Sequence, residues 1–268
     1  MKSALTKHAF FAVVGLAVLA VVPARADEWS KTYKLTGKPD LRIETSDANI
    51  RVTTWDQNSI EAKVITSRYK IGEGGIHVDE RQTGDSVEID VRYPHHYVGF
   101  EWGNHRVDVI IQMPREGNVN LRTGDGRIEL AGLKGQMDLH SGDGSESLDH
   151  VDGKLHATTG DGHIQANGRF DELELKTGDG HVDVRAGTGS SLASNWRLET
   201  GDGSVSLEVP GNLAADVDLH TSDGHIDLDM PVSTEGKIRQ NEVHGKINGG
   251  GSLLTIRTGD GSIHLRKG

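Results

Sequence analysis

The chain has 268 residues, a formal net charge of −11 and no cysteine. The lack of cysteine excludes disulfide bonds and thiolate metal sites, and the negative charge argues against binding to nucleic acid or to an anionic membrane surface. Hydrophobic residues make up only 34% of the chain, whereas glycine alone contributes 35 residues. This composition predicts an all-β protein of many short strands around a thin core, because no long window has helical spacing.

The first 26 residues have the features of a signal peptide. Lys2 and Lys7 precede the apolar run AFFAVVGLAVLAVV, and small residues end the segment at Ala26. We therefore predict cleavage after Ala26 and export to the periplasm, the outer surface or the medium. The segment contains three basic residues and no acid, so the mature chain from Asp27 has a net charge of −14. No later segment is predicted to span a membrane.

Residues 27–118 are predicted to form a less regular β region, in which Trp29, Tyr33 and Trp55 help to cap one end of the fold. The segment YPHHYVGFEWGNH, residues 93–105, lies between two strand-like segments. Two interpretations are open: a flap over the end of the fold, or a loop that contacts a ligand such as a glycan, since aromatic faces suit sugar rings. The candidate binding residues are Tyr93, Tyr97, Phe100 and Trp102.

Residues 119–268 contain regular repeats of Thr-Gly-Asp-Gly, or a close variant, followed by an alternating apolar segment. The motif aspartates recur at intervals of 18, 18, 18, 23, 21 and 37 residues, which is typical of a repeat architecture. The last interval is predicted to hold two units, the second being the degenerate VHGKI at residues 243–247. Related segments begin at Thr45 and Thr83. The motif aspartates are Asp125, Asp143, Asp161, Asp179, Asp202, Asp223 and Asp260.

Each repeat is predicted to be a strand, a tight corner and a second strand. In VNLRTGDGRIEL, Val119, Leu121 and Ile128 share one face and alternate with polar residues. At the corner, glycine is expected to supply a positive φ and aspartate to accept a backbone N–H. Two architectures fit: a single-stranded parallel β-helix (β-solenoid) with coils of 18–23 residues, or an antiparallel β-meander of hairpins. Near-identity of residues in register favours the parallel β-helix.

One repeat departs from the pattern. In SGDGSESLDH, Glu146 stands where the other repeats have isoleucine or valine. Because a buried unpaired carboxylate is very costly, we expect a local bulge that turns Leu148 inward instead.

These features together resemble a bacterial family of β-strand-repeat proteins known as "putative adhesins" (domain of unknown function 4097). The resemblance rests on the signal peptide, on IRVTTWDQNSIEAKV, on RVDVIIQMPREGNVNLRTGDGRIEL and on the repeated TGDGxI, and it covers roughly residues 40–268. It implies a parallel β-helix in the cell envelope without established catalytic residues. Gly-Asp-Gly is more uniform here than in the family pattern, which leaves a metal-binding specialisation open.

In a parallel β-helix the motif aspartates would form one column. Carboxylates about 4.8 Å apart repel each other by about 0.9 kcal/mol even in water. Hydrogen bonds from local backbone N–H groups offset this in the interpretation that we favour, and calcium at the same aspartates is the alternative. The motif is not the calcium-binding nonapeptide repeat. We therefore expect no cofactor and a structural role for the aspartates.

Two further columns accompany the aspartates. His163, His181 and His225 follow the motif in three repeats, and because arginine or serine takes this place elsewhere, we expect a solvated face. A transition-metal site of His163 and His181 with Asp161 and Asp179 is the minor alternative. The third column is expected to form a ladder of hydroxyl groups beside the corner, from Thr123, Thr159, Thr177, Thr200, Thr221 and Thr258.

No catalytic motif is present: there is no cysteine, no GxSxG and no HExxH. We predict a non-catalytic, exported envelope protein, an adhesin or surface-binding module with an unidentified protein or glycan partner. The alternatives are a periplasmic structural or regulatory scaffold and a polysaccharide-active β-helix enzyme, which the short returns between strands disfavour. Only Arg266, Lys267 and Gly268 follow the last apolar residue, so the C-terminal strand is expected to be an exposed edge that self-associates.

Overall fold

The computed structural model describes residues 27–67, 69–94, 106–234 and 239–268, and within them the protein is all-β with no helix, as predicted. The predicted signal peptide and Tyr97, Phe100 and Trp102 lie outside the described residues. The strands are β1 (Asp27–Lys34), β2 (Asp40–Thr45), β3 (Asn49–Trp55), β4 (Ser59–Thr66), β5 (His77–Thr83), β6 (Ser86–Arg92), β7 (Val107–Pro114), β8 (Glu116–Thr123), β9 (Ile128–Ala131), β10 (Lys134–Ser141), β11 (Glu146–Thr159), β12 (Ile164–Thr177), β13 (Val182–Ala186), β14 (Trp196–Thr200), β15 (Val205–Val209), β16 (Ala215–Thr221), β17 (Ile226–Asp229), β18 (Glu242–Ile247), β19 (Leu253–Thr258) and β20 (Ile263–Lys267).

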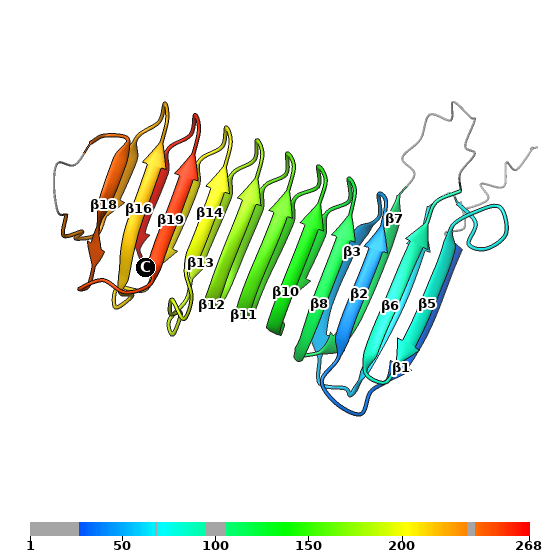
Figure 1. Cartoon of the computed structure of the whole chain (residues 1–268). Helices are drawn as coiled ribbons and strands as arrows, with labels where there is room; N and C mark the ends of the chain where they lie inside the picture. The colour runs from blue at the N-terminus through cyan, green and yellow to red at the C-terminus, as the bar shows by residue number, and fades with distance from the viewer. Residues whose placement is uncertain (1–26, 68, 95–105, 235–238) are drawn as a thin grey trace, which may run out of the picture.

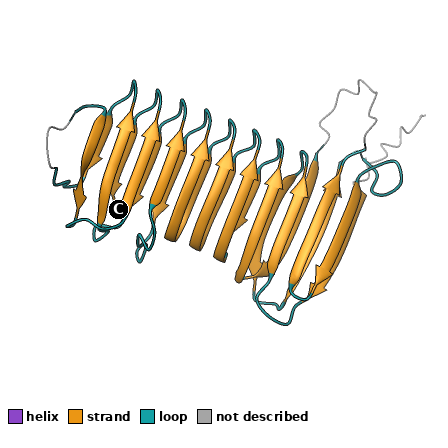
Figure 2. Ribbon diagram, viewed as in Figure 1, coloured by secondary structure: helices purple, strands orange, loops and turns teal. Residues whose placement is uncertain are grey.

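The strands form two rows that run along an elongated molecule (Figures 1 and 2). The front row is β5, β6, β2, β8, β10, the second half of β11, the second half of β12, β14, β19, β16 and β18. The back row is β1, β4, β7, β3, β9, the first half of β11, the first half of β12, β13, β15, β20 and β17. We call a front strand, its corner and the following back strand a coil.

Period-two alternation of apolar and polar residues decides which side chains enter the core. Along β8 and β10, every second residue near the corner is buried, and its neighbours face solvent. The side chains of both rows point inward in the same way. The buried residues therefore form one continuous cluster along the whole elongated molecule, which we call the rod. Both the N-terminal region and the regular repeats contribute to this cluster.

Consecutive repeats pair in parallel with equivalent residues side by side, so Thr177 lies beside both Thr159 and Thr200. The antiparallel meander is therefore wrong for the repeats. The sheet is nevertheless mixed, because β1–β4, β4–β7, β5–β6 and β16–β18 are antiparallel pairs. Parallel coils thus make up the body of the rod, and antiparallel strands close its two ends.

The coils do not follow the order of the chain at either end. Coil β2–β3 lies between β6–β7 and β8–β9, and coil β19–β20 lies between β14–β15 and β16–β17. The C-terminal strand β20 is therefore paired on both sides, and the prediction that it is an exposed edge is wrong.

The two segments related to the motif form different structures. The segment at Thr45 forms a true corner between β2 and β3. The segment at Thr83 is instead the turn of the β5–β6 hairpin, where Gly84 has a φ of 62°. The predicted degenerate coil at residues 243–247 is also wrong, because β18 is a single strand that pairs antiparallel with β16.

Glu146 faces the core without a bulge, contrary to expectation. It is in register with Ile128 on one side and Ile164 on the other, and Leu148 continues that register. The side chain is 1% exposed, and neither carboxylate oxygen has a hydrogen-bond partner among the described residues. Ser141 stands in place of threonine in the same coil.

An ion pair between β1 and β5 covers the core at the N-terminal end of the rod. Lys31 of β1 forms an ion pair with Glu80 of β5, and its Nζ lies 5.4 Å from the centre of the Tyr33 ring. Tyr33 is buried beneath this pair. Charges that point inward at a sheet edge discourage the addition of another strand. No helix long and apolar enough to cross a membrane occurs in the described ranges.

Candidate functional site

Six corners have glycine on both sides of the aspartate, and these glycines are required because consecutive coils approach very closely. A Cβ atom added at Gly180 would lie 1.9 Å from the carbonyl oxygen of Gly162, and one added at Gly178 would lie 2.6 Å from that of Gly160. No corner glycine has a φ in the left-handed region. The expectation that these glycines supply a positive φ is therefore wrong; they remove a side chain that would hold the coils apart.

A ladder of buried hydroxyl groups joins the corners, as predicted. Thr177 Oγ1 accepts the Gly180 N–H at 3.2 Å and donates to the Gly162 carbonyl oxygen at 2.8 Å. Each hydroxyl therefore closes its own corner and bonds to the coil before it. Equivalent pairs of bonds are made by Thr123, Ser141, Thr159, Thr200, Thr221 and Thr258.

Replacing one rung should weaken the rod measurably. Thr177→Val is expected to lower the free energy of unfolding by about 1–3 kcal/mol, because valine keeps the shape but leaves a buried N–H and carbonyl without this partner. Urea denaturation gives the value. Thr158→Val, on the outer side of the adjacent strand, is the control and should change it by less than about 0.5 kcal/mol. Equal losses in the two variants would contradict the ladder.

The aspartates of the motif line up along the exposed edge formed by the corners, which we call the corner edge. All are exposed, and within the described residues none of their carboxylates forms a hydrogen bond or ion pair. The expected bonds from local backbone N–H groups are absent there, since threonine accepts the N–H instead. Their order along the rod is Asp47, Asp125, Asp143, Asp161, Asp179, Asp202, Asp260 and Asp223.

The residue after each motif forms a second ladder on the solvent side. Nδ1 of His163 accepts the backbone N–H of His181 at 3.0 Å, and Nδ1 of His181 accepts that of Ser204 at 2.9 Å. The two imidazole rings stack at 5.0 Å. Ser145 and Ser204 accept in the same way through Oγ. Serine and histidine both provide the acceptor atom for this bond, whereas Arg127, in the same column, has none.

The structure gives no direct support for a metal at this edge. Across the described ranges, no group of three or more His, Asp or Glu residues is placed to hold a metal ion. His163 and His181 use Nδ1 to bind backbone, which leaves only Nε2 of each ring toward solvent. Calcium at the aspartates and a transition metal at the histidines stay predictions.

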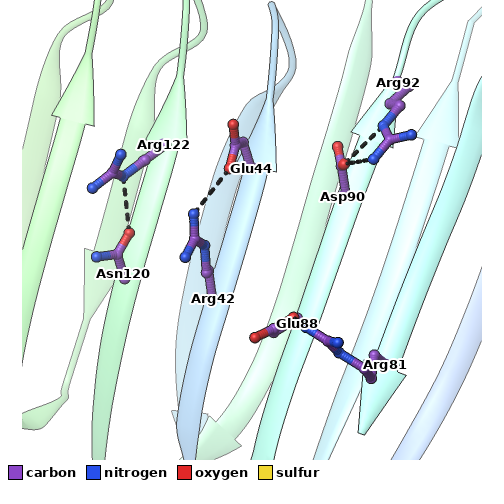
Figure 3. A network of polar contacts seen from close by, with 8 residues as sticks. All are labelled: Arg42, Glu44, Arg81, Glu88, Asp90, Arg92, Asn120 and Arg122. Carbon is purple, nitrogen blue, oxygen red and sulfur yellow. Dashed lines mark hydrogen bonds and ion pairs between the residues drawn. The ribbon is translucent and has the colours of Figure 1, made fainter.

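The outer face of the front row neutralises its own charges. Figure 3 shows Arg92 bound to Asp90 and Arg81 bound to Glu88 on β5 and β6. Further along, Arg42 bonds to Glu44 on β2 at 3.2 Å, and Arg122 bonds to Asn120 on β8 (Figure 3). This face therefore offers few unpaired charges to a ligand, in contrast to the corner edge.

A groove of about 520 Å³ lies where the corner edge meets the back row, near the N-terminal end of the rod. Its walls come from β3, β7, β9 and the corners of three neighbouring coils. The groove is lined by hydrogen-bonding side chains, including Asp47, Asn49, Asp108, Asp125, Arg127 and Glu129.

Ion pairs and amide bonds hold the groove walls in place. Arg51 Nε donates to Glu129 at 2.6 Å, and Arg106 Nε donates to Asp108 at 2.9 Å. Asn49 links two walls, because its amide donates to Asp108 at 3.0 Å and accepts the Arg127 N–H at 3.0 Å. The walls are thus fixed, while the carboxylates of the motif aspartates stay available.

Burial and a neighbouring carboxylate together raise the pKa of one acid in the groove. Burial against the corner raises the pKa of Asp47, and the carboxylate of Asp125 raises that pKa further. A hydroxyl donor or a cation placed between these two carboxylates would relieve their repulsion. The groove is therefore suited to a ligand that presents several hydrogen-bond donors.

Tyr93 is the predicted binding residue that the structure describes, and it stands beside this groove. It is half-buried, and its ring meets that of Tyr69 edge-on at 5.8 Å. Burial raises the pKa of the Tyr93 hydroxyl, and the groove residues Asp47 and Asp108 add to this rise.

Sequence reasoning missed most of the groove. Asn49, Arg51, Arg106 and Asp108 were not singled out, because they come from β3 and from the start of β7, outside the regular repeats. Their one visible signal is position: Asn49, Arg51 and Asp108 are polar residues at outward places in alternating strands, and Arg106 directly precedes β7. Only the interleaving of coil β2–β3 brings them beside Asp125.

The stacked coils, the two corner ladders and the exposed groove define a β-repeat protein that offers a hydrophilic edge for binding. Residues 115–191 and 167–266 match the model of the Toastrack DUF4097 family. Together these matches span more than half of the chain, and the protein belongs to this family. No curated protein matches it in sequence.

Several solved structures have a distantly similar form. One is a "putative cell adhesion protein" from Clostridium sporogenes, 14% identical, with a TM-score of 0.46 over 91% of this chain and 100% of that one. Another is a "putative adhesin" from Bacteroides fragilis, 11% identical, with a TM-score of 0.44 over 91% and 98% of the two chains. A third is a "putative lipid binding protein" from Parabacteroides distasonis, 11% identical, with a TM-score of 0.38 over 89% and 96%. Similarity this low does not transfer a function.

Proposed function

We propose that the protein is an exported, non-catalytic binding module of the bacterial cell envelope, and that it binds a saccharide in the groove at the corner edge. The observation that carries this proposal is the groove itself, which combines fixed carboxylate, amide and guanidinium groups with the nearby Tyr93. Planar polar side chains can bond to neighbouring hydroxyl groups in pairs, and an aromatic ring suits the apolar face of a sugar.

The position of the acids supports binding rather than catalysis. The groove is open, and the motif aspartates on its rim are exposed. A general acid needs a raised pKa and access to substrate. Glu146, with its pKa raised to about 8, is sealed in the core with 1% exposure. Asp47 also has a raised pKa, but it stands on the exposed rim of an open groove, where no enclosed site among the described residues holds a substrate for proton transfer.

Export and a surface location remain part of the proposal. The predicted signal peptide supports export, and the polar outer faces with paired charges suit a rod that stands in an aqueous compartment. A periplasmic scaffold is the competing function, and it would require a protein partner instead of a glycan.

A pair of substitutions in the groove tests saccharide binding. Asp125→Asn with Arg127→Ser keeps the fold, because serine already follows the motif at Ser145 and Ser204. Binding to purified peptidoglycan fragments, lipopolysaccharide and capsular polysaccharide would be measured by calorimetry. We expect at least one to bind the wild type, and the double variant to bind it about tenfold more weakly.

The matched control for this experiment is Asp202→Asn, which changes the same motif position in a coil distant from the groove. It should bind like the wild type. Equal loss in the control and the groove variant would place binding elsewhere on the rod, and no binding of any polysaccharide by the wild type would contradict the proposal.

A further inference from the structure

The last coil of the chain occupies a slot between two coils that precede it in sequence. Strands β19 and β20 pair with β14 and β15 on one side and with β16 and β17 on the other. In Figure 1 the red strand β19, the first strand of this coil, stands between β14 and β16. The chain must therefore leave a gap one coil wide, which the final residues fill.

The contacts that hold this coil are the same as those between any two consecutive coils. Thr258 Oγ1 donates to the Gly203 carbonyl at 2.7 Å, and Thr221 Oγ1 donates to the Gly261 carbonyl at 2.7 Å. Thr200 makes this bond to Gly180 at the same distance in the regular part of the rod. The slot thus recognises the repeat motif, and a coil from a second copy satisfies it equally well.

The segment that leads into the slot contains three consecutive residues with positive φ. Residues 248–252 connect β18 to β19 across the end of β16. Asn248, Gly249 and Gly250 have φ values of 48°, 92° and 87°. Asparagine tolerates the left-handed conformation, and the following glycines give the segment a wide range of alternative conformations. The side-chain amide of Asn248 donates to the carbonyl oxygens of Gly211 at 2.9 Å and Leu213 at 2.7 Å, and these are the contacts that a change of direction here would break.

We infer that the C-terminal coil, residues 253–267, exchanges between two copies of the protein, each donating its coil to the slot of the other. Residues 248–252 act as the hinge. All contacts at β14, β15, β16 and β17 are retained in the exchanged dimer, so only the hinge changes, which is the condition that favours exchange of identical elements.

Like charge disfavours the alternative way of pairing two copies at this end. Strand β17 pairs with no described strand beyond β20, and its Ile226 N–H donates to the Gln240 carbonyl oxygen at 3.0 Å. Its outward residues Asp227 and Asp229 would face their own counterparts in a symmetric antiparallel pair. Exchange of the whole coil avoids this repulsion because it forms no contact between two β17 strands.

A pair of introduced cysteines tests the inference, since the chain has none of its own. Glu208 and Arg266 are register partners on β15 and β20. In the variant Glu208→Cys/Arg266→Cys, a monomer forms a disulfide within the chain, whereas an exchanged dimer forms disulfides between chains. The matched control is Asn167→Cys/Arg185→Cys, register partners in consecutive coils that no exchange separates.

Both variants would be refolded from denaturant over a range of concentrations and run on a non-reducing gel. We expect the fraction of disulfide-linked dimer to rise with concentration for Glu208→Cys/Arg266→Cys, and the control to give monomers throughout. The unmodified protein should show a matching dimer by light scattering, which also covers the case of a variant that does not fold. Monomers only, or a dimer whose disulfides all lie within one chain, would overturn the inference.

Discussion

Glu146→Ile is expected to raise the free energy of unfolding by on the order of 3 kcal/mol at neutral pH. Isoleucine occupies this place at Ile128 and Ile164 in the adjacent coils, so it fits the register. The gain comes from removing a buried carboxyl group that has no hydrogen-bond partner among the described residues. Urea denaturation at several pH values measures it.

The pH dependence follows from the direction of the pKa shift. Burial raises the pKa of Glu146 from 4.5 to about 8, and the nearby Ser141 backbone opposes this only in part. Below pH 4.5 the carboxyl is protonated in both the folded and unfolded chain. As the pH rises from there to about 8, only the unfolded chain loses its proton, so stability falls by about 1.4 kcal/mol per pH unit.

Two further variants separate charge from packing. Glu146→Gln should abolish the pH dependence while leaving a buried polar group, so its stability lies between those of wild type and Glu146→Ile. Adding Ser141→Thr to Glu146→Ile restores the combination found in the neighbouring coils and should stabilise the rod further. A wild-type stability that is flat between mildly acidic and mildly alkaline pH would show that Glu146 is not buried as described.

Gly180→Ala is expected to prevent folding or to destabilise the protein by more than about 4 kcal/mol. The added Cβ would lie 1.9 Å from the Gly162 carbonyl oxygen and 2.9 Å from Thr177 Oγ1. Relief requires separating two coils, which breaks backbone bonds in both rows. Circular dichroism and the urea midpoint of the purified variant measure the effect.

The neighbouring aspartate and a distant glycine are the controls. Asp179→Asn should alter stability by less than about 0.5 kcal/mol, because its carboxylate has no described partner. Gly84→Ala, where φ is 62° and nothing lies within 4 Å of the added Cβ, should cost only about 1 kcal/mol. If Asp179→Asn destabilised as much as Gly180→Ala, the aspartate would have the corner role that we assign to glycine and threonine.

Local features of the repeats were predictable because they depend on residues close in sequence. The alternation around Val119 and Ile128 fixed which side chains enter the core, and equal spacing placed Thr177 beside Thr159. The same register shows that Glu146 faces inward. The expected bulge was wrong because this strand keeps the register of its neighbours, so that Glu146 and Leu148 both face inward.

Features that depend on distant segments were not predictable. The corner of coil β2–β3, residues 45–48, keeps the threonine and aspartate of the motif but neither glycine, and nothing in the sequence says that it stacks on β9 instead of on a sequential neighbour. For the same reason, the sequence does not show that coil β19–β20 lies between coils β14–β15 and β16–β17. Because the groove joins Asn49 and Arg106 to Asp125, it could only be found once this interleaving was known.

The role of glycine was misjudged for a related reason. An Asp-Gly pair between alternating segments is a common hairpin signal, and it implies a positive φ. Here the corner turns between two rows instead of between paired strands, and the constraint at Gly162 or Gly180 comes from the next coil. A contact between repeats cannot be seen in one repeat alone.

We propose that the rod is a binding module displayed outside the cell, and protease treatment of intact cells tests this location. A periplasmic protein serves as the marker for an intact outer barrier. Our account predicts rapid loss of the rod while the marker survives. Full protection of the rod until the barrier is opened would contradict surface display and favour a periplasmic scaffold.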